Sequence, residues 1–343
     1  MSPNDESGSA QDGDGAASPI DLVGSLTAYQ QSALIGTAVE TGLADALASG
    51  PRSLAELVEL LGTDERGTMA LLAGLVTFGL VERDGDAFGL TAQGALLGSD
   101  HPDSIAQIVL KEWFFYRLWA DLPDAVRTGH AQTGPWRERL EDDPPQAESF
   151  LRALDDLCTL FGGELPGLAA LEGPGTLLDV GGGAGSHAAN LLEENPALEA
   201  TVLDLPGAEP VLRERHPDLE FVAGDFDQAR FGRPEGEAWD YVLLSNILHD
   251  HPAEYNKRLV SEAASLLKPG GSLVIYEWVI DPGRTSPEGV AKFTAMMVVE
   301  NEGGWTWTEQ EIAAWISGAG LEPQPMNRGF GPIAVIRGLN PGS

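Results

Sequence analysis

"LLDVGGGAGSHAANLL", residues 177–192, is the segment that decides the fold class. An apolar run ends in a glycine-rich turn, and apolar residues at helical spacing follow the turn. A strand that passes through a glycine turn into a helix is the first unit of an open α/β sheet. Gly181, Gly183 and Gly185 follow the pattern G-x-G-x-G. The segment therefore predicts a ligand-binding loop at the carboxyl end of the first parallel strand.

The strand pattern recurs through the C-terminal half of the chain. Short β-rich apolar runs alternate with helical segments, namely "ATVLDL", "LEFVAGD", "YVLLSNIL", "SLVIYEWVI" and "PIAVIRG". Continuous apolar runs are typical of parallel strands that are buried on both faces. The helix predicted over 253–267 ends at the stop signal "KPGG". Residues 173–343 are therefore predicted to form a doubly wound, Rossmann-like α/β domain whose ligands bind beyond the carboxyl ends of the strands.

The N-terminal part of the chain predicts a mainly helical domain. Residues 1–18 are rich in Gly, Ser and Asp and predict a disordered acidic tail. Within residues 19–104, Ser53 and Glu56 have the spacing of a capping box. A second helical segment and a hairpin with the turn Asp84-Gly85 follow, which is the outline of a winged helix.

A winged helix can bind DNA or hold two subunits together. The candidate recognition helix offers Asp64, Glu65 and only one cation, Arg66, and its remainder is apolar. Sequence-specific DNA binding requires cationic side chains that contact the phosphates and polar side chains that contact the base edges. The pattern therefore favours a subunit interface over nucleic-acid binding.

Residues 105–172 predict a helical connector that lines the substrate pocket. The stretch "KEWFFYRLW", 111–119, is typical either of a core or dimer contact or of a substrate wall, and Trp119 is the candidate wall residue. The single cysteine, Cys158, excludes an internal disulfide and a cysteine-built zinc site. It is expected to be a core thiol.

The bulk charge limits the partners and the compartment. The net charge of -33 arises from 53 acidic against 20 basic residues. Such a field repels phosphate backbones, which argues against nucleic acid and anionic membranes as partners. No apolar run is long enough for a membrane span, and the N-terminus lacks the features of a signal peptide. The expected compartment is the cytoplasm.

Residues next to the glycine loop indicate the cofactor. Ser186 stands where a nicotinamide-binding loop carries its third glycine. Asp204 closes the second strand, where a carboxylate can accept both ribose hydroxyls, and Asp225 and Phe226 close the third, where they suit an adenine ring. This pattern favours S-adenosylmethionine over a nicotinamide dinucleotide. The residues expected to hold it are Asp179, Gly181, Gly183, Gly185, Asp204, Leu205, Asp225, Phe226 and Ser245.

The run "LLSNILHDHP", 243–252, ends in two imidazoles that flank a carboxylate. Three interpretations compete: a metal site, a satisfied structural turn, or a base at the mouth of a pocket. A metal site would need an extended chain, so that His249 and His251 share a face, and a third ligand such as Glu277. If His249 is instead a base, Asp250 points the other way in an extended chain and is expected to cap the following helix.

With these motifs the sequence resembles the small-molecule O-methyltransferases, which include plant caffeic acid and acetylserotonin enzymes and bacterial polyketide tailoring enzymes. The stretches that carry the resemblance are "LLDVGGGAG", "VLDLP", "AGDF", "NILHD" and "NEGG". The resemblance implies a winged-helix dimerisation domain and a homodimer. It also implies His249 as general base, Glu277 as its assistant and Asn301 as a substrate contact. It explains the His-Asp-His run without a metal.

The implied reaction is methyl transfer to a hydroxyl of an aromatic or polyketide-like molecule. The acceptor oxygen must lose its proton at or before attack, and imidazole, with an ordinary pKa near 6.5, suits that task. Two positions depart from the family pattern: Thr306 replaces a second glutamate of the plant enzymes, and Ser245 replaces a lysine. Without that glutamate the base would rely on Glu277, or on Glu302.

Two other functions remain open at this stage. Some relatives of the fold use the cofactor's positive charge for decarboxylation, hydroxylation or ring closure, but those reactions do not require the base. A winged-helix regulator without enzymatic activity is the other alternative.

The acidic composition also predicts a requirement for salt. It resembles that of proteins from salt-accumulating halophiles, whose acidic surfaces stay hydrated in concentrated salt, and we favour this interpretation over an ordinary acidic cytoplasmic protein. We expect the protein to lose folded structure when molar potassium chloride is removed, because unscreened carboxylates then repel one another. Circular dichroism and thermal unfolding across a salt series measure this. Equal folding with and without molar salt would contradict a halophilic origin.

Overall fold

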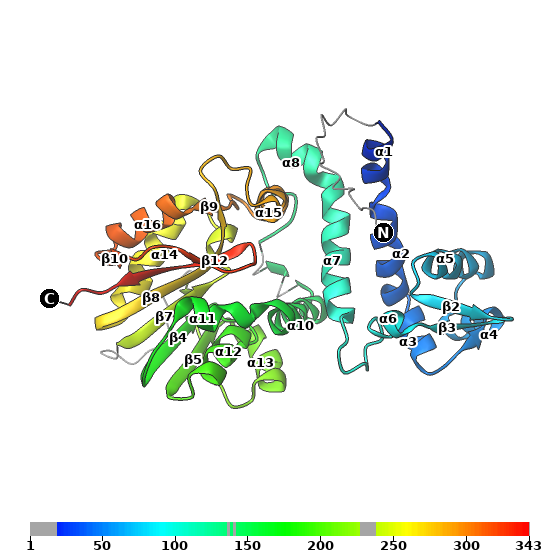
Figure 1. Cartoon of the computed structure of the whole chain (residues 1–343), viewed down its shortest axis with the longest axis horizontal. Helices are drawn as coiled ribbons and strands as arrows, with labels where there is room; N and C mark the ends of the chain where they lie inside the picture. Colours follow the sequence, from blue (N-terminus) through cyan, green and yellow to red (C-terminus); the bar gives the residue numbers. More distant parts are fainter. Residues whose placement is uncertain (1–18, 136–137, 140–141, 227–237, 343) are drawn as a thin grey trace, which may run out of the picture.

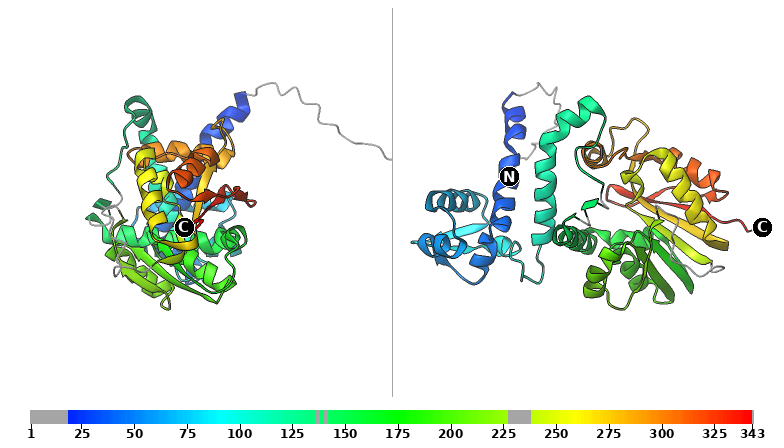
Figure 2. Two further views of the ribbon diagram at one scale, coloured as in Figure 1. Left: turned by 90° about the vertical axis from the view of Figure 1, so that its left-hand side faces the viewer. Right: turned by 180° about the vertical axis from the view of Figure 1, so that it is seen from behind.

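The computed structural model describes residues 19–135, 138–139, 142–226 and 238–342. The tail predicted over residues 1–18 lies outside the described residues. Figure 1 shows a small N-terminal domain and a larger sheet domain on either side of the long helices α7 (Ala106–Leu118) and α10 (Pro144–Phe161). Figure 2 shows the same separation from behind. Among the helices of the described residues, none has both the length and the apolar character needed to cross a membrane.

The N-terminal domain consists of short helices around a three-stranded sheet with the order β1-β3-β2. The predicted capping box is confirmed, because Ser53 and Glu56 hydrogen-bond each other's backbone N–H at the start of α4. The hairpin turns at Gly85, whose φ of 58° suits glycine. The elements are α1 (Pro19–Thr27), α2 (Tyr29–Glu40), α3 (Leu43–Ala48), β1 (Arg52–Ser53), α4 (Leu54–Leu61), α5 (Glu65–Thr77), β2 (Val81–Asp84), β3 (Ala87–Leu90) and α6 (Ala92–Ala95).

The connector is helical, as predicted. Helix α7 packs against α2 on one side and α10 on the other. Arg117 of α7 forms an ion pair with Glu40 of α2. The further elements of the connector are η1 (Trp119–Asp121), α8 (Leu122–Thr128), η2 (Gly162–Glu164) and α11 (Leu165–Ala169).

The large sheet has the order β10-β12-β8-β7-β4-β5-β6. Strands β4 to β8 are parallel, and β12 pairs with β8 in the antiparallel direction. The strands are β4 (Gly175–Val180), β5 (Leu198–Asp204), β6 (Glu220–Ala223), β7 (Trp239–Ser245), β8 (Leu267–Ile280), β10 (Glu322–Pro323), β12 (Ile333–Leu339) and the short β9 (Trp307–Thr308) and β11 (Asn327–Arg328).

Helices cover both faces of this sheet, so the predicted doubly wound fold is confirmed (Figure 1). One apolar core lies between the sheet and α14 and α16, and a second lies between the sheet and α11 and α12. The predicted helix after residue 253 ends at Ser265, and "KPGG" already belongs to β8. The sheet helices are α12 (Ser186–Glu194), α13 (Glu209–Arg215), α14 (Ala253–Ser265), α15 (Glu288–Glu300) and α16 (Glu309–Gly318), with η3 (Pro206–Ala208) and η5 (Leu248–Asp250).

The strand order reverses at β4, which has β5 on one side and β7 on the other. Ligands of open α/β sheets bind at such a switch point, beyond the carboxyl ends of the strands. The glycine loop after β4, Asp204 at the end of β5 and the turn after β7 all lie at this edge. The fold therefore gathers these predicted site residues from the ends of three strands at one edge.

Candidate active site

The glycine loop is packed closely against its neighbours. Gly181, Gly183 and Gly185 have φ values of 67°, 57° and 86°, a region that side chains rarely adopt. A Cβ atom at Gly181 would lie 2.8 Å from Cδ1 of Ile247 and 3.1 Å from the Phe226 ring. The loop therefore needs glycine both for its conformation and for the close approach of its neighbours.

Asp204 holds the loop in place. Its Oδ2 accepts a hydrogen bond from the Gly183 N–H at 2.7 Å, and its Oδ1 accepts one from the Leu205 N–H at 2.6 Å. Burial raises the pKa of the Asp204 carboxyl, and these two backbone hydrogen bonds offset part of that rise. The carboxylate at the end of β5 is thus part of the loop's own architecture.

Asp179 is a buried acid beside the loop with no side-chain partner among the described residues. It is 0% exposed, and burial, with the nearby charge of Asp204, raises its pKa to about 7. A Cβ at Gly182 would lie 2.6 Å from this carboxylate. A buried carboxylate without a side-chain partner is stabilised by a cationic or donor group nearby. The loop and its acids therefore fit a ligand with a positive charge, such as S-adenosylmethionine.

The remaining residues predicted for the cofactor lie along the same edge. Phe226 follows β6, contacts the main sheet core, and meets the ring of His251 edge to face at 6.4 Å. Asp225 precedes it, and the neighbouring Gly224 N–H donates to the Asp204 carbonyl at 2.9 Å. Ser245 is the buried last residue of β7. The structure thus brings the predicted set to the ends of four adjacent strands.

His249 lies in η5, just beyond β7, and its ring is fixed by Glu277 of β8. The His249 Nδ1 atom lies 2.7 Å from Glu277 Oε1. Glu277 is only 1% exposed, and it also accepts hydrogen bonds from the backbone N–H groups of Leu248 and Trp278. These contacts hold the carboxylate still, so the imidazole Nδ1 faces Glu277 and Nε2 faces the other way.

The charge around the imidazole favours its protonated form. Burial alone would lower the pKa of His249, but the carboxylates of Glu277 and Asp250 and the hydrogen bond to Glu277 outweigh burial and raise the pKa to about 9. Asp250 Oδ1 lies 3.6 Å from the Nε2 atom. The imidazole is therefore placed between two carboxylates, one on each nitrogen.

The prediction that Asp250 caps the next helix is wrong. Helix α14 begins after Pro252 and has no side-chain cap. Asp250 instead accepts a hydrogen bond at Oδ1 from Asn301 Nδ2 at 2.6 Å. The prediction assumed an extended chain, in which neighbouring side chains point to opposite faces. Residues Leu248–Asp250 form a 3-10 turn instead, so His249 and Asp250 share one side.

His251 lies away from this pair. Its ring stacks on Tyr255 of α14, with 4.0 Å between the ring centroids. No group of three His, Cys, Asp or Glu side chains among the described residues is arranged to hold a metal ion.

Aromatic and sulfur-containing side chains lie next to His249. The ring of Phe293 meets the imidazole edge to face at 4.9 Å and stacks on Trp278 at 4.4 Å. A small core continues from Phe293 between α7, α10 and α15; its members are Phe114, Phe115, Leu118, Phe150, Phe293, Met296 and Met297. We call these seven residues the aromatic cluster. Trp119 is 41% exposed in η1 and does not belong to it.

Thr306, which replaces the second glutamate, and Glu302, the alternative brace for the base, both find other partners. Thr306 is fully buried, and its hydroxyl lies 2.5 Å from that of Thr294 on α15. Glu302 pairs with the exposed His130 at 2.9 Å. Neither side chain contacts the imidazole in these interactions. Glu277 and Asp250 therefore supply the carboxylates on its two nitrogens.

Sequence reasoning missed a buried ion pair near the base. Glu300, 6% exposed at the end of α15, pairs with Arg139 at 3.1 Å. The two residues are 161 positions apart, so no local pattern joins them. The aromatic cluster could have been predicted in part from the sequence, because Phe293, Met296 and Met297 recur at helical spacing on α15.

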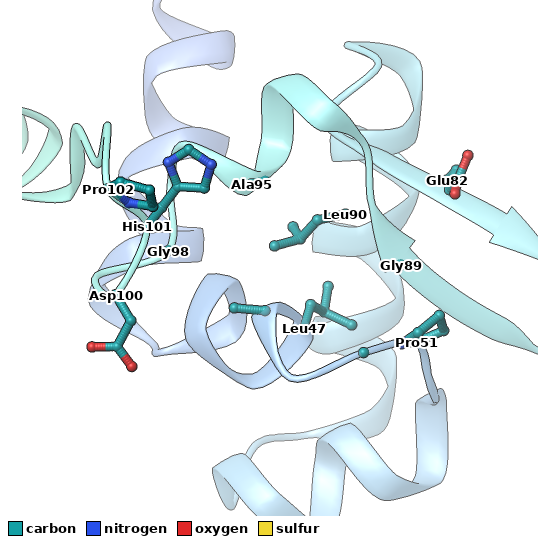
Figure 3. A pocket seen from close by; sticks show the side chains of 12 residues that line it. Leu47, Pro51, Glu82, Gly89, Leu90, Ala95, Gly98, Asp100, His101 and Pro102 are labelled. Carbon is teal, nitrogen blue, oxygen red and sulfur yellow. The ribbon is translucent and has the colours of Figure 1, made fainter.

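A separate hollow of about 440 Å³ lies in the N-terminal domain. Figure 3 shows Leu47, Leu90 and Pro51 on one side and His101 and Asp100 on the other. None of its lining residues belongs to the glycine loop or to the surroundings of His249. It is therefore not part of the candidate active site.

The fold and the site define the class of S-adenosylmethionine-dependent methyltransferases. A family model described as an O-methyltransferase domain matches residues 119–322, and one described as an O-methyltransferase dimerisation domain matches residues 24–100. The chain belongs to this O-methyltransferase family and uses S-adenosylmethionine as its cofactor.

Known relatives resemble the chain over most of its length. The tetracenomycin polyketide synthesis 8-O-methyl transferase TcmO of Streptomyces glaucescens is 30% identical over 94% of this chain and 97% of its own. The 3-hydroxy-5-methyl-1-naphthoate 3-O-methyltransferase of Streptomyces sahachiroi is 30% identical over 95% and 93%. The crystal structure of human N-acetylserotonin methyltransferase in complex with SAM superposes with a TM-score of 0.81 at 24% identity, covering 96% of this chain and 100% of that one. The last likeness shows the shared fold.

We expect the imidazole of His249 to titrate near pH 9 in the ligand-free protein, because carboxylates flank both nitrogens. Since the folded pKa lies above the ordinary value of 6.5, the stability from this contact is complete below pH 6.5 and is lost as the pH rises through about 9. Histidine NMR titration measures the pKa, with His249→Asn to assign the signal. Glu277→Gln should lower the pKa by about one unit or more. A wild-type value at or below 6.5 would contradict the flanking geometry.

Proposed function

We propose that the acceptor is a hydroxyl of an aromatic or polyketide-derived small molecule and that His249 is the general base. The observation that carries the proposal is the imidazole, fixed by Glu277, next to the aromatic cluster. Aromatic walls suit a flat acceptor, and a fixed base suits a hydroxyl that must lose its proton. The named acceptors of TcmO and of the naphthoate enzyme support this class of substrate.

The bound cofactor supplies an electrophilic methyl group. The protein's contribution is to hold the acceptor and move its proton. The His249 Nδ1–H donates to Glu277 Oε1, so Nε2 is the nitrogen that takes the proton from the hydroxyl. Glu277 and Asp250 stabilise the imidazolium that forms. Reactions without a proton transfer would not need this pair, which favours methyl transfer over the non-methylating alternatives.

We assign the cofactor-binding roles to the edge of the sheet. In this proposal the glycine loop and Asp179 meet the amino acid part, Asp204 meets the ribose, and Asp225 and Phe226 meet the adenine, with Leu205 and Ser245 beside them. Support comes from the close-packed glycine loop and from the buried Asp179 carboxylate, which has no side-chain hydrogen-bond partner among the described residues. Asn301, predicted as a substrate contact, is assigned a positioning role instead, because its amide already holds Asp250.

We also propose a homodimer. The match to a dimerisation domain supports it, and so does the apolar face of α1. Four side chains of that helix are at least 58% exposed; they are Ile20, Leu22, Val23 and Leu26. Contiguous exposed apolar surface marks a protein interface. Helix α5, whose only charged residues are Glu65 and Arg66, supports subunit contact over nucleic-acid binding. The composition supports a cytoplasm rich in salt as the compartment.

Removing the proposed base should slow turnover strongly and leave the affinity for the cofactor unchanged. We expect His249→Ala to lower kcat by about two to four powers of ten, the usual loss for a positioned base. The affinity for S-adenosylmethionine, measured by calorimetry, should change little. His101→Ala, in the N-terminal domain, is the matched control. Unchanged turnover in His249→Ala would remove this residue from the mechanism.

Changing Asp204 at the end of β5 should weaken the binding of S-adenosylmethionine without altering the fold. Asp204→Asn retains an oxygen for a loop N–H but loses the charge that favours two hydroxyl donors. We expect the affinity for S-adenosylmethionine to fall about tenfold or more, with an unchanged circular dichroism spectrum. Asp218→Asn, on an exposed turn, is the control. Equal affinity in both variants would show that Asp204 does not bind the ribose.

A further inference from the structure

Helix α10 contacts both the glycine loop and the aromatic cluster. A Cβ at Gly183 would lie 3.4 Å from Cδ2 of Leu151, so this side chain of α10 packs on the loop. Two turns further along α10, the Sγ atom of Cys158 lies 3.3 Å from Nδ1 of His187 on α12. Positions i and i+7 of a helix share a face. Phe150, the neighbour of Leu151, belongs to the aromatic cluster. One helix therefore touches both halves of the proposed site.

Asp155 lies between Leu151 and Cys158 on this face and makes a buried polar contact with α12. It is 5% exposed, and its Oδ1 accepts a hydrogen bond from Ser186 Oγ at 2.5 Å. Ser186 is the first residue of α12 and directly follows Gly185, which has no side chain to cap the helix. A carboxylate at this end of a helix also interacts favourably with the helix dipole. Asp155 thus holds the segment that leads out of the glycine loop.

Cations from the end of α13 balance the buried charge of Asp155. His216 Nε2 lies 2.8 Å from Asp155 Oδ1, and Arg215 Nη1 lies 3.6 Å from Oδ2. Burial alone would raise the pKa of Asp155, but the hydrogen bonds from His216 and Ser186 and the charges of His216 and Arg215 outweigh burial and lower the pKa. Hydrogen bonds to an ionised carboxylate are stronger than those to a neutral group. The contact with Ser186 is therefore a charge-assisted hydrogen bond.

We propose that Asp155 is a positioning residue that couples the two halves of the site: by holding Ser186, it transmits cofactor binding at the glycine loop to α10 and so to the aromatic cluster. The inference rests on the proposed function where it takes the aromatic cluster as the wall for the acceptor. A cofactor that orders the loop also orders the start of α12, and the hydrogen bond to Asp155 then fixes α10. The acceptor binds a wall that is already ordered, so the two ligands bind cooperatively.

The size of this coupling follows from the hydrogen bond that carries it. A charge-assisted hydrogen bond changes an equilibrium constant about tenfold or more. Coupling is reciprocal, so the cofactor raises the affinity for the acceptor by the same factor as the acceptor raises the affinity for the cofactor. A residue that only stabilises the fold would affect the free energy of unfolding and leave this factor unchanged.

Hydrogen exchange tests the transmission without knowledge of the acceptor. S-adenosylhomocysteine, the product that methyl transfer leaves, is added at saturating concentration to the wild type, to Asp155→Asn and to Ser186→Ala. We expect it to slow exchange in the wild type at residues 181–186 and in α10. In both variants the protection of α10 should fall about tenfold while the loop stays protected. Ser186→Thr retains the hydroxyl and should restore the protection.

A matched control breaks a different contact between α10 and α13. Arg152 of α10 pairs with Glu214 of α13 at 2.7 Å, and the Glu214 side chain is 50% exposed. Glu214→Gln removes this pair and leaves the contact between Asp155 and Ser186 in place. We expect its α10 to be protected by S-adenosylhomocysteine as in the wild type, because an exposed ion pair contributes little.

Calorimetry measures the coupling factor itself. 2-Naphthol, an aromatic compound with one hydroxyl, is titrated into the same proteins with and without S-adenosylhomocysteine. We expect S-adenosylhomocysteine to raise the affinity for 2-naphthol about tenfold in the wild type and in Glu214→Gln, and about threefold or less in Ser186→Ala.

The outcomes separate the inference from the proposed function. Equal protection of α10 in Ser186→Ala and the wild type would overturn the role of Asp155, and so would protection that stays confined to the glycine loop in the wild type. If 2-naphthol binds neither the free nor the ligand-bound protein, the aromatic acceptor is overturned, while the exchange data still decide the role of Asp155. Ser186→Ala removes one hydroxyl at a half-buried position, so it decides the matter even if Asp155→Asn does not fold.

Discussion

The hydrogen bond between His249 Nδ1 and Glu277 Oε1 is the interaction on which the active site depends. A carboxylate that is 1% exposed is costly unless several donors satisfy it. Glu277 has four: the imidazole and the backbone N–H groups of Leu248, His249 and Trp278. Three of these come from the turn after β7. The same contacts that stabilise the buried charge therefore fix the turn and the imidazole.

The parallel sheet makes this contact possible. Ser245 of β7 is in register with Tyr276 of β8, so the carboxyl ends of the two strands lie side by side. Glu277 comes one residue later on β8, and the turn brings His249 back over it. The strand order puts β4 and β5, with their glycine loop and Asp204, on the other side of β7. One topological feature thus places the proposed base next to the proposed cofactor site.

The sequence predicted the parts of this arrangement that follow from the sheet. The glycine pattern, the acids at strand ends and the alternation of strands and helices depend on local periodicity and on the common edge of parallel strands. Asp250 was placed wrongly, because extended geometry was assumed for a 3-10 turn. Arg139 and Glu300 lie 161 positions apart on two different segments, and only the packed structure joins them. The place of Phe293 could have been predicted from the sequence, since its spacing to Met296 and Met297 is helical.

The charge around His249 explains why a threonine suits position 306. The family pattern predicts a second glutamate there. Glu277 and Asp250 already raise the pKa of His249 to about 9, so the unprotonated base is the minor form at neutral pH. A further carboxylate beside the ring would raise the pKa again and reduce that form further. The Thr306 hydroxyl instead meets Thr294 on α15, the helix that carries Phe293. The position therefore supports the aromatic wall beside the imidazole, and Asp250 remains the second carboxylate.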